Sequence, residues 1–336
     1  MKRLLFVSAL CSLLPLAAQP GVARAEVSEI TIAQQYGMAY LQFLVMQRDH
    51  LVAKHAKAEG LGDIKVTWHK FSASNIMYDA VLSGDLQIAS GGLTPLITIW
   101  ARTRDNYKVH GLAAMNAMPL LLNTREANVK TIKDFTSKSR IALPAVKISQ
   151  QAITLQMAAA QAFGDAGFNR LDPLTVSMSH PDGMQALMSG ESEVTAHLTS
   201  PPYSYQELAD PKIHTVLNSY DVAGGPTTFT VLWCTGKFRD ENPKAYKAVL
   251  EAFREATDIV NKAKRAAAEL YVQMEHPKLT VDQVYKMLTS PGVDYTLAPS
   301  GVMKYADFMY AHGLIKVKPT SWKDVFFPEI HDLHGS

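Results

Sequence analysis

Cysteine is almost absent from this chain, which has two in 336 residues, Cys11 and Cys234. We expect Cys11 to leave with an N-terminal leader, so Cys234 is then alone and the mature chain has no internal disulfide. The apolar segment 231–234 is typical of a buried strand, which makes Cys234 a predicted core residue rather than a catalytic thiol. Nowhere do His, Cys, Asp and Glu cluster at the spacing of metal ligands, and we expect neither a metal nor another cofactor.

A surplus of positive charge is also missing, since 33 Lys and Arg residues stand against 31 Asp and Glu. Loss of residues 1–25 would remove Lys2, Arg3 and Arg24 and no acid, leaving 30 basic residues against 31 acidic ones. This balance offers no basic surface to nucleic acid or to anionic lipid, and we predict neither as a partner.

Long apolar runs are missing except at the N-terminus. Lys2 and Arg3 precede an apolar run at 4–14, and the small residues of 23–25 fit a cleavage site. The alternative is a membrane anchor, but the run is too short to span a bilayer comfortably and Pro15 ends it. We predict a signal peptide, residues 1–25, cleaved after Ala25, and a soluble periplasmic chain that is a monomer.

Strand and helix patterns alternate through the rest of the chain. The predicted strands are 28–34, 64–71, 107–113, 140–143, 174–178, 193–198, 214–217 and 227–234, with a further one before Gly91. The predicted helices are 38–47, 75–82, 93–102, 132–135, 150–163, 181–189, 203–208, 244–274, 281–287 and 300–311. Such alternation predicts parallel sheets covered by helices on both faces.

The chain leaves the first sheet once and returns once, through crossings near 115–121 and 221–228. We therefore predict two α/β lobes, the first made of residues 26–115 and 226–336 and the second of 116–225. Two connecting segments allow hinge motion and leave a ligand cleft between the lobes.

The stretch 84–95 combines a short strand, two glycines and a helix start. Gly91 and Gly92 leave backbone amides bare, while Thr94 suits a helix cap and Pro95 the first helical position. Free amides at a helix start form a site for a small polar or anionic group.

Strand ends of this kind face the ligand crevice of an open α/β sheet. Their residues here are hydroxyls, amides, bare backbone and aromatics with almost no carboxylate, which suits a small ligand with an anionic or carbonyl head. The predicted ligand-binding residues are Gln35, Tyr36, Met38, Ser72, Gly91, Gly92, Thr94, Asn116, Val146, Lys147, Ser149, His197, Ser200, Tyr203, Gly224 and Gly225.

Each of these residues also has a purely structural interpretation. Tyr36 can cover the end of its strand, Ser72 can cap a helix, His197 can be a core histidine and Lys147 can point to solvent. His197 has no acid near it in sequence, and neither a nucleophile elbow nor a phosphate loop is present. We predict no catalytic residue, so binding is favoured over chemistry.

Several stretches resemble the periplasmic solute-binding proteins of ABC importers for nitrate, sulfonate, taurine and bicarbonate, a superfamily shared with binders of thiamine-pyrimidine precursors. The matching stretches are 30–37, 68–71, 80–92, 132–135, 186–191 and 242–245. The resemblance implies a type II periplasmic binding protein fold, capture by lobe closure and delivery to an ABC permease in the inner membrane. The segments 72–74 and 144–147 depart from the family pattern where ligand is expected.

Three hypotheses for function remain open. The first is capture of a small organic anion, a sulfonate or a carboxylate, for an ABC importer. A pyrimidine or another neutral heterocycle, held by Tyr36, His197 and Tyr203, is the second. The third is a periplasmic enzyme on the same fold, and service to a chemoreceptor is a variant of the first that the sequence does not separate.

Overall fold

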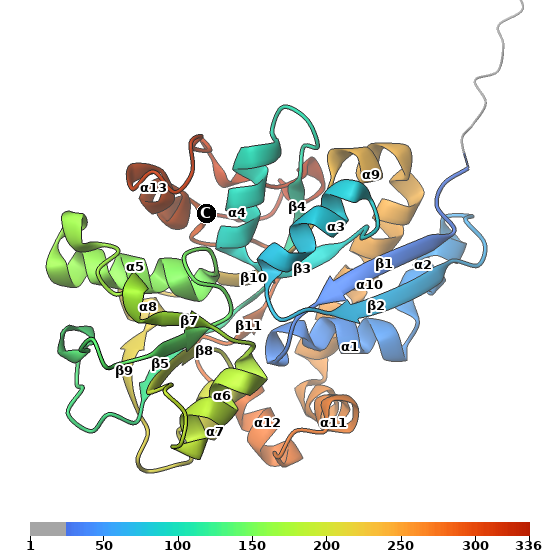
Figure 1. Cartoon of the computed structure of the whole chain (residues 1–336). Helices are drawn as coiled ribbons and strands as arrows, with labels where there is room; N and C mark the ends of the chain where they lie inside the picture. The colour runs from blue at the N-terminus through green and yellow to red at the C-terminus, as the bar shows by residue number, and fades with distance from the viewer. Residues whose placement is uncertain (1–24) are drawn as a thin grey trace, which may run out of the picture.

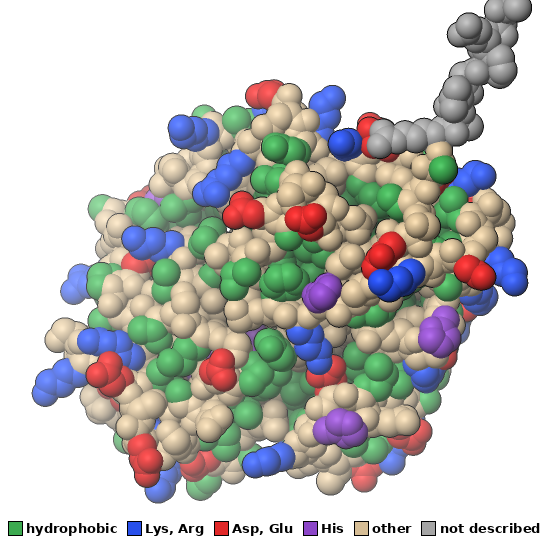
Figure 2. All heavy atoms as spheres, turned by 45° about the vertical axis from the view of Figure 1, so that its right-hand side comes forward, with side chains coloured by type: hydrophobic (Ala, Val, Ile, Leu, Met, Phe, Trp, Pro, Cys, Tyr) green, Lys and Arg blue, Asp and Glu red, His purple; other side chains and the backbone are tan. Residues whose placement is uncertain are grey.

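The computed structural model describes residues 25–336, so the predicted signal peptide lies outside the described residues except for Ala25. Within that range, none of the helices has the length and apolar character needed to cross a membrane. Two bodies of sheet and helix make up the chain (Figure 1). On the face drawn in Figure 2, positive and negative side chains are interspersed.

The first lobe contains two small sheets joined by one bridge. Strands β1 (Glu29–Gln34) and β2 (Lys65–Lys70) pair in parallel, and Ile32 of β1 forms a parallel bridge with Ile88, beside β3 (Ala89–Gly92). A four-stranded sheet follows in the order β11-β4-β10-β3, with β4 at His110–Ala117, β10 at Thr228–Cys234 and β11 at Asp294–Tyr295. Because β10 runs antiparallel to both β3 and β4, the prediction of a wholly parallel sheet is wrong here.

The second lobe contains a five-stranded sheet in the order β7-β6-β8-β5-β9. Its strands are β5 (Leu121–Thr124), β6 (Ile141–Leu143), β7 (Thr175–Ser177), β8 (Ala196–Thr199) and β9 (His214–Asn218). The β6 strand pairs in parallel with β7 and β8, as predicted, whereas β5 pairs antiparallel with β8 and β9. Sequence patterns did not predict β5, since its leucines were assigned to a crossing.

Helices surround both lobes. Those of the first lobe are α1 (Leu41–Arg48), α2 (Leu51–Ala58), α3 (Tyr78–Ser83), α4 (Leu93–Thr103), α9 (Gly236–Glu241), α10 (Pro243–Lys262), α11 (Lys264–Glu275), α12 (Val281–Leu288) and α13 (Val302–Ala311). In the second lobe are α5 (Gln150–Phe163), α6 (His180–Ser189), α7 (Tyr203–Glu207) and α8 (Ser219–Ala223). Short 3-10 turns lie at Met38–Tyr40, Ser74–Met77, Ile132–Asp134, Asp165–Gly167, Asp172–Leu174, Trp322–Asp324 and Pro328–Ile330.

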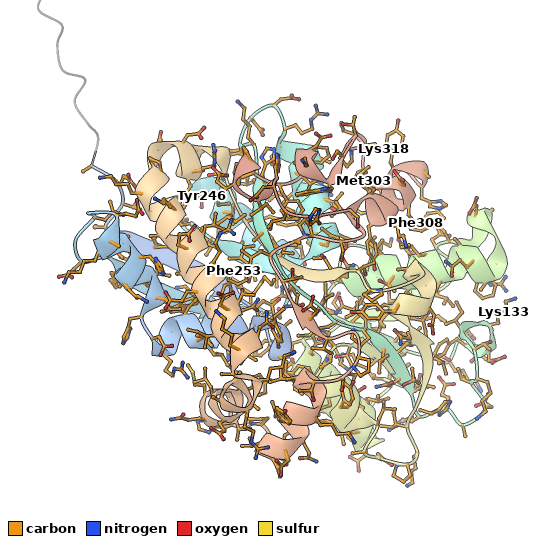
Figure 3. All side chains as sticks on the ribbon, turned by 180° about the vertical axis from the view of Figure 1, so that it is seen from behind. Lys133, Tyr246, Phe253, Met303, Phe308 and Lys318 are labelled. Carbon is orange, nitrogen blue, oxygen red and sulfur yellow. The ribbon has the colours of Figure 1, made fainter. Side chains whose placement is uncertain are left out.

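Helix α10, in front in Figure 3, packs its buried face onto the core of the first lobe. Phe253 of this helix is fully buried and meets Phe43 of α1 with ring centroids 6.1 Å apart. Phe43 in turn packs 5.2 Å from the ring of Trp68 on β2. Cys234 at the end of β10 is buried, as predicted, and burial raises the pKa of its thiol well above the ordinary value.

The chain passes twice between the four-stranded sheet and the second lobe, from Ala117 to Leu121 and from Ala223 to Thr228. We propose the lobe boundaries at these segments, with residues 26–115 and 226–336 on one side and 116–225 on the other.

The start of α4 lies at the predicted residue but has a different cap, and the long helix predicted at 244–274 is divided. Helix α4 begins at Leu93 with Gly92 as its N-cap, so Thr94 is not the cap and Pro95 is not the first residue. The hydroxyl of Thr94 donates instead to the carbonyl of Ile148 in the other lobe. The helix predicted at 244–274 is two helices, since Ala263 leaves helical geometry with φ −132° and ψ 52°.

Candidate functional site

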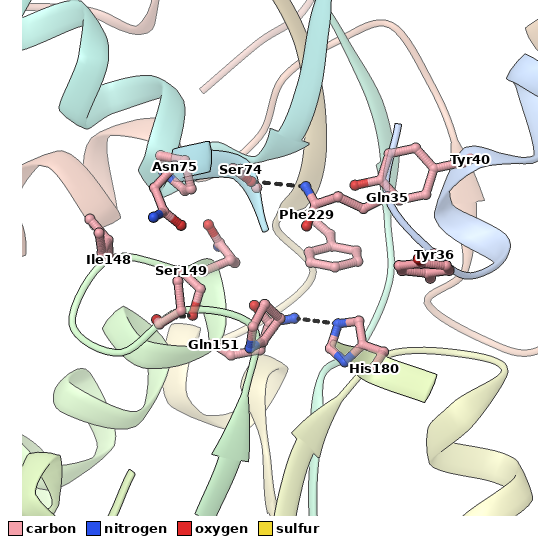
Figure 4. A pocket seen from close by; sticks show the side chains of 15 residues that line it. Gln35, Tyr36, Tyr40, Ser74, Asn75, Ile148, Ser149, Gln151, His180 and Phe229 are labelled. Atoms are coloured by element: carbon pink, nitrogen blue, oxygen red, sulfur yellow. Dashed lines mark hydrogen bonds between the residues drawn. The ribbon is translucent and has the colours of Figure 1, made fainter. Parts of the chain in front are cut away.

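A cavity of about 20 Å³ lies between the two lobes, with walls from both. Figure 4 shows these side chains pointing toward one another across it. The first lobe contributes Gln35, Tyr36, Tyr40, Ser74, Asn75, Gly92, Pro95 and Phe229, and the second lobe contributes Pro144, Ala145, Ile148, Ser149, Gln150, Gln151 and His180.

On the first-lobe wall, Gln35 follows directly after β1 and its side chain is held in place. Its Nε2 donates to Ser74 Oγ at 2.9 Å and to the Ser90 carbonyl at 3.3 Å. A β-carbon at Gly91 would lie 2.6 Å from Gln35 Nε2 and nearer still to Ser74, so only glycine leaves room for this pair. The role of Gly91 is therefore to let two polar side chains meet at the wall.

Aromatic rings and one unpaired amide complete this wall. Tyr36, Tyr40 and Phe229 face the cavity, and burial raises the pKa of Tyr40, so its hydroxyl stays protonated. The buried Oδ1 of Asn75 has no hydrogen-bond partner. Because an unmet polar group in a closed space is costly, Asn75 is a natural contact for a polar ligand.

The polar side chains on the second-lobe wall of the cavity come from the starts of α5 and α6. Ser149 caps α5, with its Oγ accepting from the Ala152 amide at 3.2 Å. His180 is the first residue of α6, which Ser179 caps. The Nε2 atoms of Gln151 and His180 lie 3.2 Å apart at the cavity wall (Figure 4).

Three helices thus begin at the cavity: α4 after Gly92, α5 after Ser149 and α6 at His180. Helix N-termini carry partial positive charge and unpaired amides, which favour anions. The lining residues of the described chain include no Lys, Arg, Asp or Glu. The arrangement suits a small anionic or strongly polar group.

Behind His180 lies a chain of fully buried polar groups. His180 Nδ1 is 3.2 Å from His197 Nε2, and His197 Nδ1 is 2.6 Å from Glu207 Oε1. Burial, and then the neighbouring His197, hold the pKa of His180 well below its ordinary value, so its imidazole is neutral. Residues 25–336 contain no group of three or more His, Cys, Asp and Glu placed to hold a metal ion.

The lobes contact each other beside the cavity. The Thr94 amide donates to Gln150 Oε1 at 2.9 Å, and the Met38 amide donates to the Pro201 carbonyl at 3.2 Å. A groove of about 950 Å³ opens next to the cavity and shares Tyr36 with it. Methionines, tyrosines and prolines of both lobes line the groove, together with the charged residues Lys70, Lys278 and Glu275.

Of the residues predicted to bind ligand, Gln35, Tyr36, Gly92 and Ser149 line the cavity. Five others lie directly beside it. Gly91 is behind Gln35, and Met38 and Thr94 are at the contacts between the lobes. The ring of Tyr203 is 5.7 Å from that of His180, and His197 is behind His180. Away from the cavity lining are Ser72, Asn116, Val146, Lys147, Ser200, Gly224 and Gly225. Among these, Ser72 and Lys147 are exposed, and Asn116 donates to the carbonyl of Ala39 and to Thr230.

Sequence analysis did not select Tyr40, Asn75, Gln151, His180 or Phe229. A signal for His180 exists, because Ser179 and Pro181 mark a helix start on either side of it. The others lie within elements and are brought to the cavity by the fold alone.

Comparison with known proteins gives the family context. A profile of the NMT1-like family matches residues 23–274. A search of the curated proteins found no match.

Solved structures share the fold. The alkanesulfonate-binding protein SsuA from Xanthomonas axonopodis pv. citri, bound to MOPS, superposes with a TM-score of 0.67 at 18% identity, over 90% of this chain and 97% of that one. The periplasmic aliphatic sulphonate binding protein SsuA from Escherichia coli gives 0.64 at 18% identity, over 90% and 92%. The periplasmic nitrate-binding protein NrtA from Synechocystis PCC 6803 gives 0.59 at 14% identity, over 78% and 70%.

Proposed function

The chain belongs to the NMT1-like family, and from this premise we propose that it is the periplasmic substrate-binding component of an ABC importer. It captures a small organic anion, a sulfonate or a carboxylate, by closing its lobes, and presents it to a permease in the inner membrane. The observation that carries this proposal is a cavity between two lobes, entered by three helix N-termini and free of acidic side chains. The three structural neighbours described above are sulfonate-binding and nitrate-binding proteins, which supports the choice of an anion.

The size of the cavity bears on the kind of anion. A water molecule needs roughly 10–15 Å³ on this scale, and the closed cavity measures about 20 Å³. The adjoining groove of about 950 Å³ begins at Tyr36 and offers apolar and aromatic surface to the rest of the ligand. Because about 20 Å³ is little more than the space of one water, the lobes must separate before a sulfonate or carboxylate head enters between Gln35, Ser149 and His180. The apolar body of such a ligand then lies in the groove.

A thermal-shift screen tests the proposal. Ethanesulfonate, benzoate and nitrate are the anionic probes, and uracil is a neutral one. A ligand present at about 100 times its Kd stabilises the native state by roughly 2.7 kcal/mol, which is readily seen as a rise in Tm. A rise with an anion supports the proposal, and no rise with any anion contradicts it.

A neutral heterocycle is the second candidate, because three aromatic rings, Tyr36, Tyr40 and Phe229, face the cavity. Rings of this kind stack on a flat ligand. A rise in Tm with uracil and none with the anions would favour this candidate.

A further inference from the structure

One of the buried residues behind the cavity is Glu207, whose charge affects the binding of an anion. Glu207 and His197 have no exposed side-chain surface. Both oxygens of Glu207 accept hydrogen bonds, Oε1 from His197 Nδ1 at 2.6 Å and Oε2 from Asn123 Nδ2 at 2.8 Å. Asn123 Nδ2 can only donate, and His197 Nδ1 is the donor in the arrangement of ring protons derived below, so Glu207 accepts at both oxygens as a carboxylate.

Two imidazoles connect this carboxylate with the cavity. Gln151 Nε2 donates to His180 Nε2 at 3.2 Å, which leaves the ring proton of His180 on Nδ1. That proton points to His197 Nε2 at 3.2 Å and to Thr199 Oγ1 at 2.9 Å. His197 in turn holds its own proton on Nδ1, toward Glu207. The free protein therefore has two ring protons, two neutral imidazoles and one negative charge.

An anion in the cavity would add a second buried negative charge without a fixed cation, since no Lys or Arg lines the described cavity. Two like charges in a closed, poorly solvated space are costly unless one is neutralised. His180 Nε2 is the atom of this chain that lies at the cavity wall, and there it can accept one further proton.

We propose that His180 and His197, backed by Glu207, take up one proton from solvent when an anion enters the cavity. The inference rests on the proposed function and adds the origin of the positive charge. The new proton sits on His180 Nε2. The Gln151 amide, whose Nε2 donates to that atom in the free protein, turns away so that the N–H of His180 is donated to the ligand. Charge then alternates through the lobe: ligand negative, imidazole pair positive, Glu207 negative.

Few other charged or titratable groups face His180. Helix α6 adds Asp182, whose carboxylate accepts from Ser179 Oγ at 2.5 Å. Tyr203 of α7 stacks on the His180 ring, and burial raises the pKa of its hydroxyl, so it stays neutral. Tyr36 and Tyr40 face the same cavity from the first lobe, and burial raises the pKa of Tyr40, so its hydroxyl stays neutral. In the adjoining groove Lys70 is paired with Glu275 at 2.7 Å, and α5 presents the uncharged Gln151. Strand β8 presents His197, and β6 packs against α6 with apolar residues only. The imidazole pair is thus the group best placed to hold the proton.

Titration calorimetry of the whole chain with ethanesulfonate, benzoate and nitrate tests this inference. The buffers are amines adjusted to the same chloride concentration, so that competition by the counter-anion is constant, and they differ in enthalpy of ionisation. We expect binding of the anion to take up close to one proton. Affinity should fall about tenfold for each unit by which the pH rises. This holds in the window between the pKa of the imidazole pair in the free protein and the higher pKa of the pair in the complex.

Variants locate the proton. His180→Gln and Glu207→Gln are expected to bring proton uptake close to zero and to remove the pH dependence of Kd. His214→Gln is the matched control, because His214 lies in the same lobe and bonds only to the Val129 carbonyl at 2.7 Å, so uptake stays near one. If the buried Glu207→Gln change prevents folding, the proton count of the wild type and of His180→Gln still decides.

The outcomes separate the two proposals. Absence of binding by every anion overturns the proposed function, and this inference with it. Anion binding without proton uptake overturns this inference and leaves the proposed function standing. Full uptake in His180→Gln also overturns it, because the proton then enters elsewhere.

Discussion

Replacing Gly92 by alanine should weaken ligand binding by obstructing the approach of the lobes. Gly92 has φ −62° and ψ 152°, values that alanine adopts without strain. Its added β-carbon would lie 3.0 Å from Gln150 Cβ on the opposite lobe and 3.2 Å from Pro95 Cδ. Ordinary carbon contacts are about 3.5–4.0 Å, so Gln150 must withdraw by roughly 0.5–1 Å. Overpacking of this kind costs about 1–3 kcal/mol, which is a loss of about 5- to 150-fold in affinity.

Calorimetry with ethanesulfonate measures the affinity, and the Tm without ligand measures stability. Gly236→Ala is the control, because its β-carbon would come 3.1 Å from Lys108 Cβ within the first lobe. That control should lower Tm and leave Kd within about twofold, whereas Gly92→Ala should raise Kd with a small change in Tm. An unchanged Kd in Gly92→Ala would refute closure of the lobes at this contact.

Three further predictions follow from the same structure. Lys147→Ala should leave the Kd of an anion within about twofold, because Lys147 is exposed and outside the cavity lining. A tenfold loss of affinity in calorimetry would contradict this and show that Lys147 contributes to binding. Phe253→Ala should lower the unfolding free energy by about 3–5 kcal/mol, since the fully buried ring packs on Phe43; urea denaturation measures this, and a loss under 1 kcal/mol would contradict the packing. Ser149→Ala should cost about 1 kcal/mol of stability through the lost cap of α5 and should also raise the Kd of an anion. A lower urea midpoint with an unchanged Kd would show that Ser149 does not contact the ligand.

Sequence patterns predicted the parts of the fold that rest on local signals. Helix α5 has the predicted bounds, because Ser149 caps it and no residue within it interrupts the helix. Helix α6 ends where Gly190 adopts the left-handed conformation, as glycine at that place indicates. The position of Gln35 and Tyr36 at the cavity could be predicted because both directly follow a clear strand.

Local signals do not determine which distant segments of the chain pair with each other. Strand β10 reads equally well as parallel or antiparallel, since only its partners β3 and β4 decide the direction. The sequence does not indicate that Glu207, ten residues after His197, is its partner. The turn into α7 is what brings Glu207 Oε1 to 2.6 Å from His197 Nδ1. His180 was missed for the same reason, as nothing local indicates that the start of α6 meets His197. Asn75, predicted only as the start of a helix, lines the cavity, whereas the predicted ligand residue Ser72 is exposed.

A crystal structure of the chain with ethanesulfonate tests the central claim most directly, namely that an anion is held between the two lobes. The account predicts electron density for the sulfonate group in the cavity, within hydrogen-bonding distance of Ser149, Gln151 and His180, with the lobes in contact around it. Density for the anion on an outer face, or an empty cavity at saturating ethanesulfonate, would contradict it.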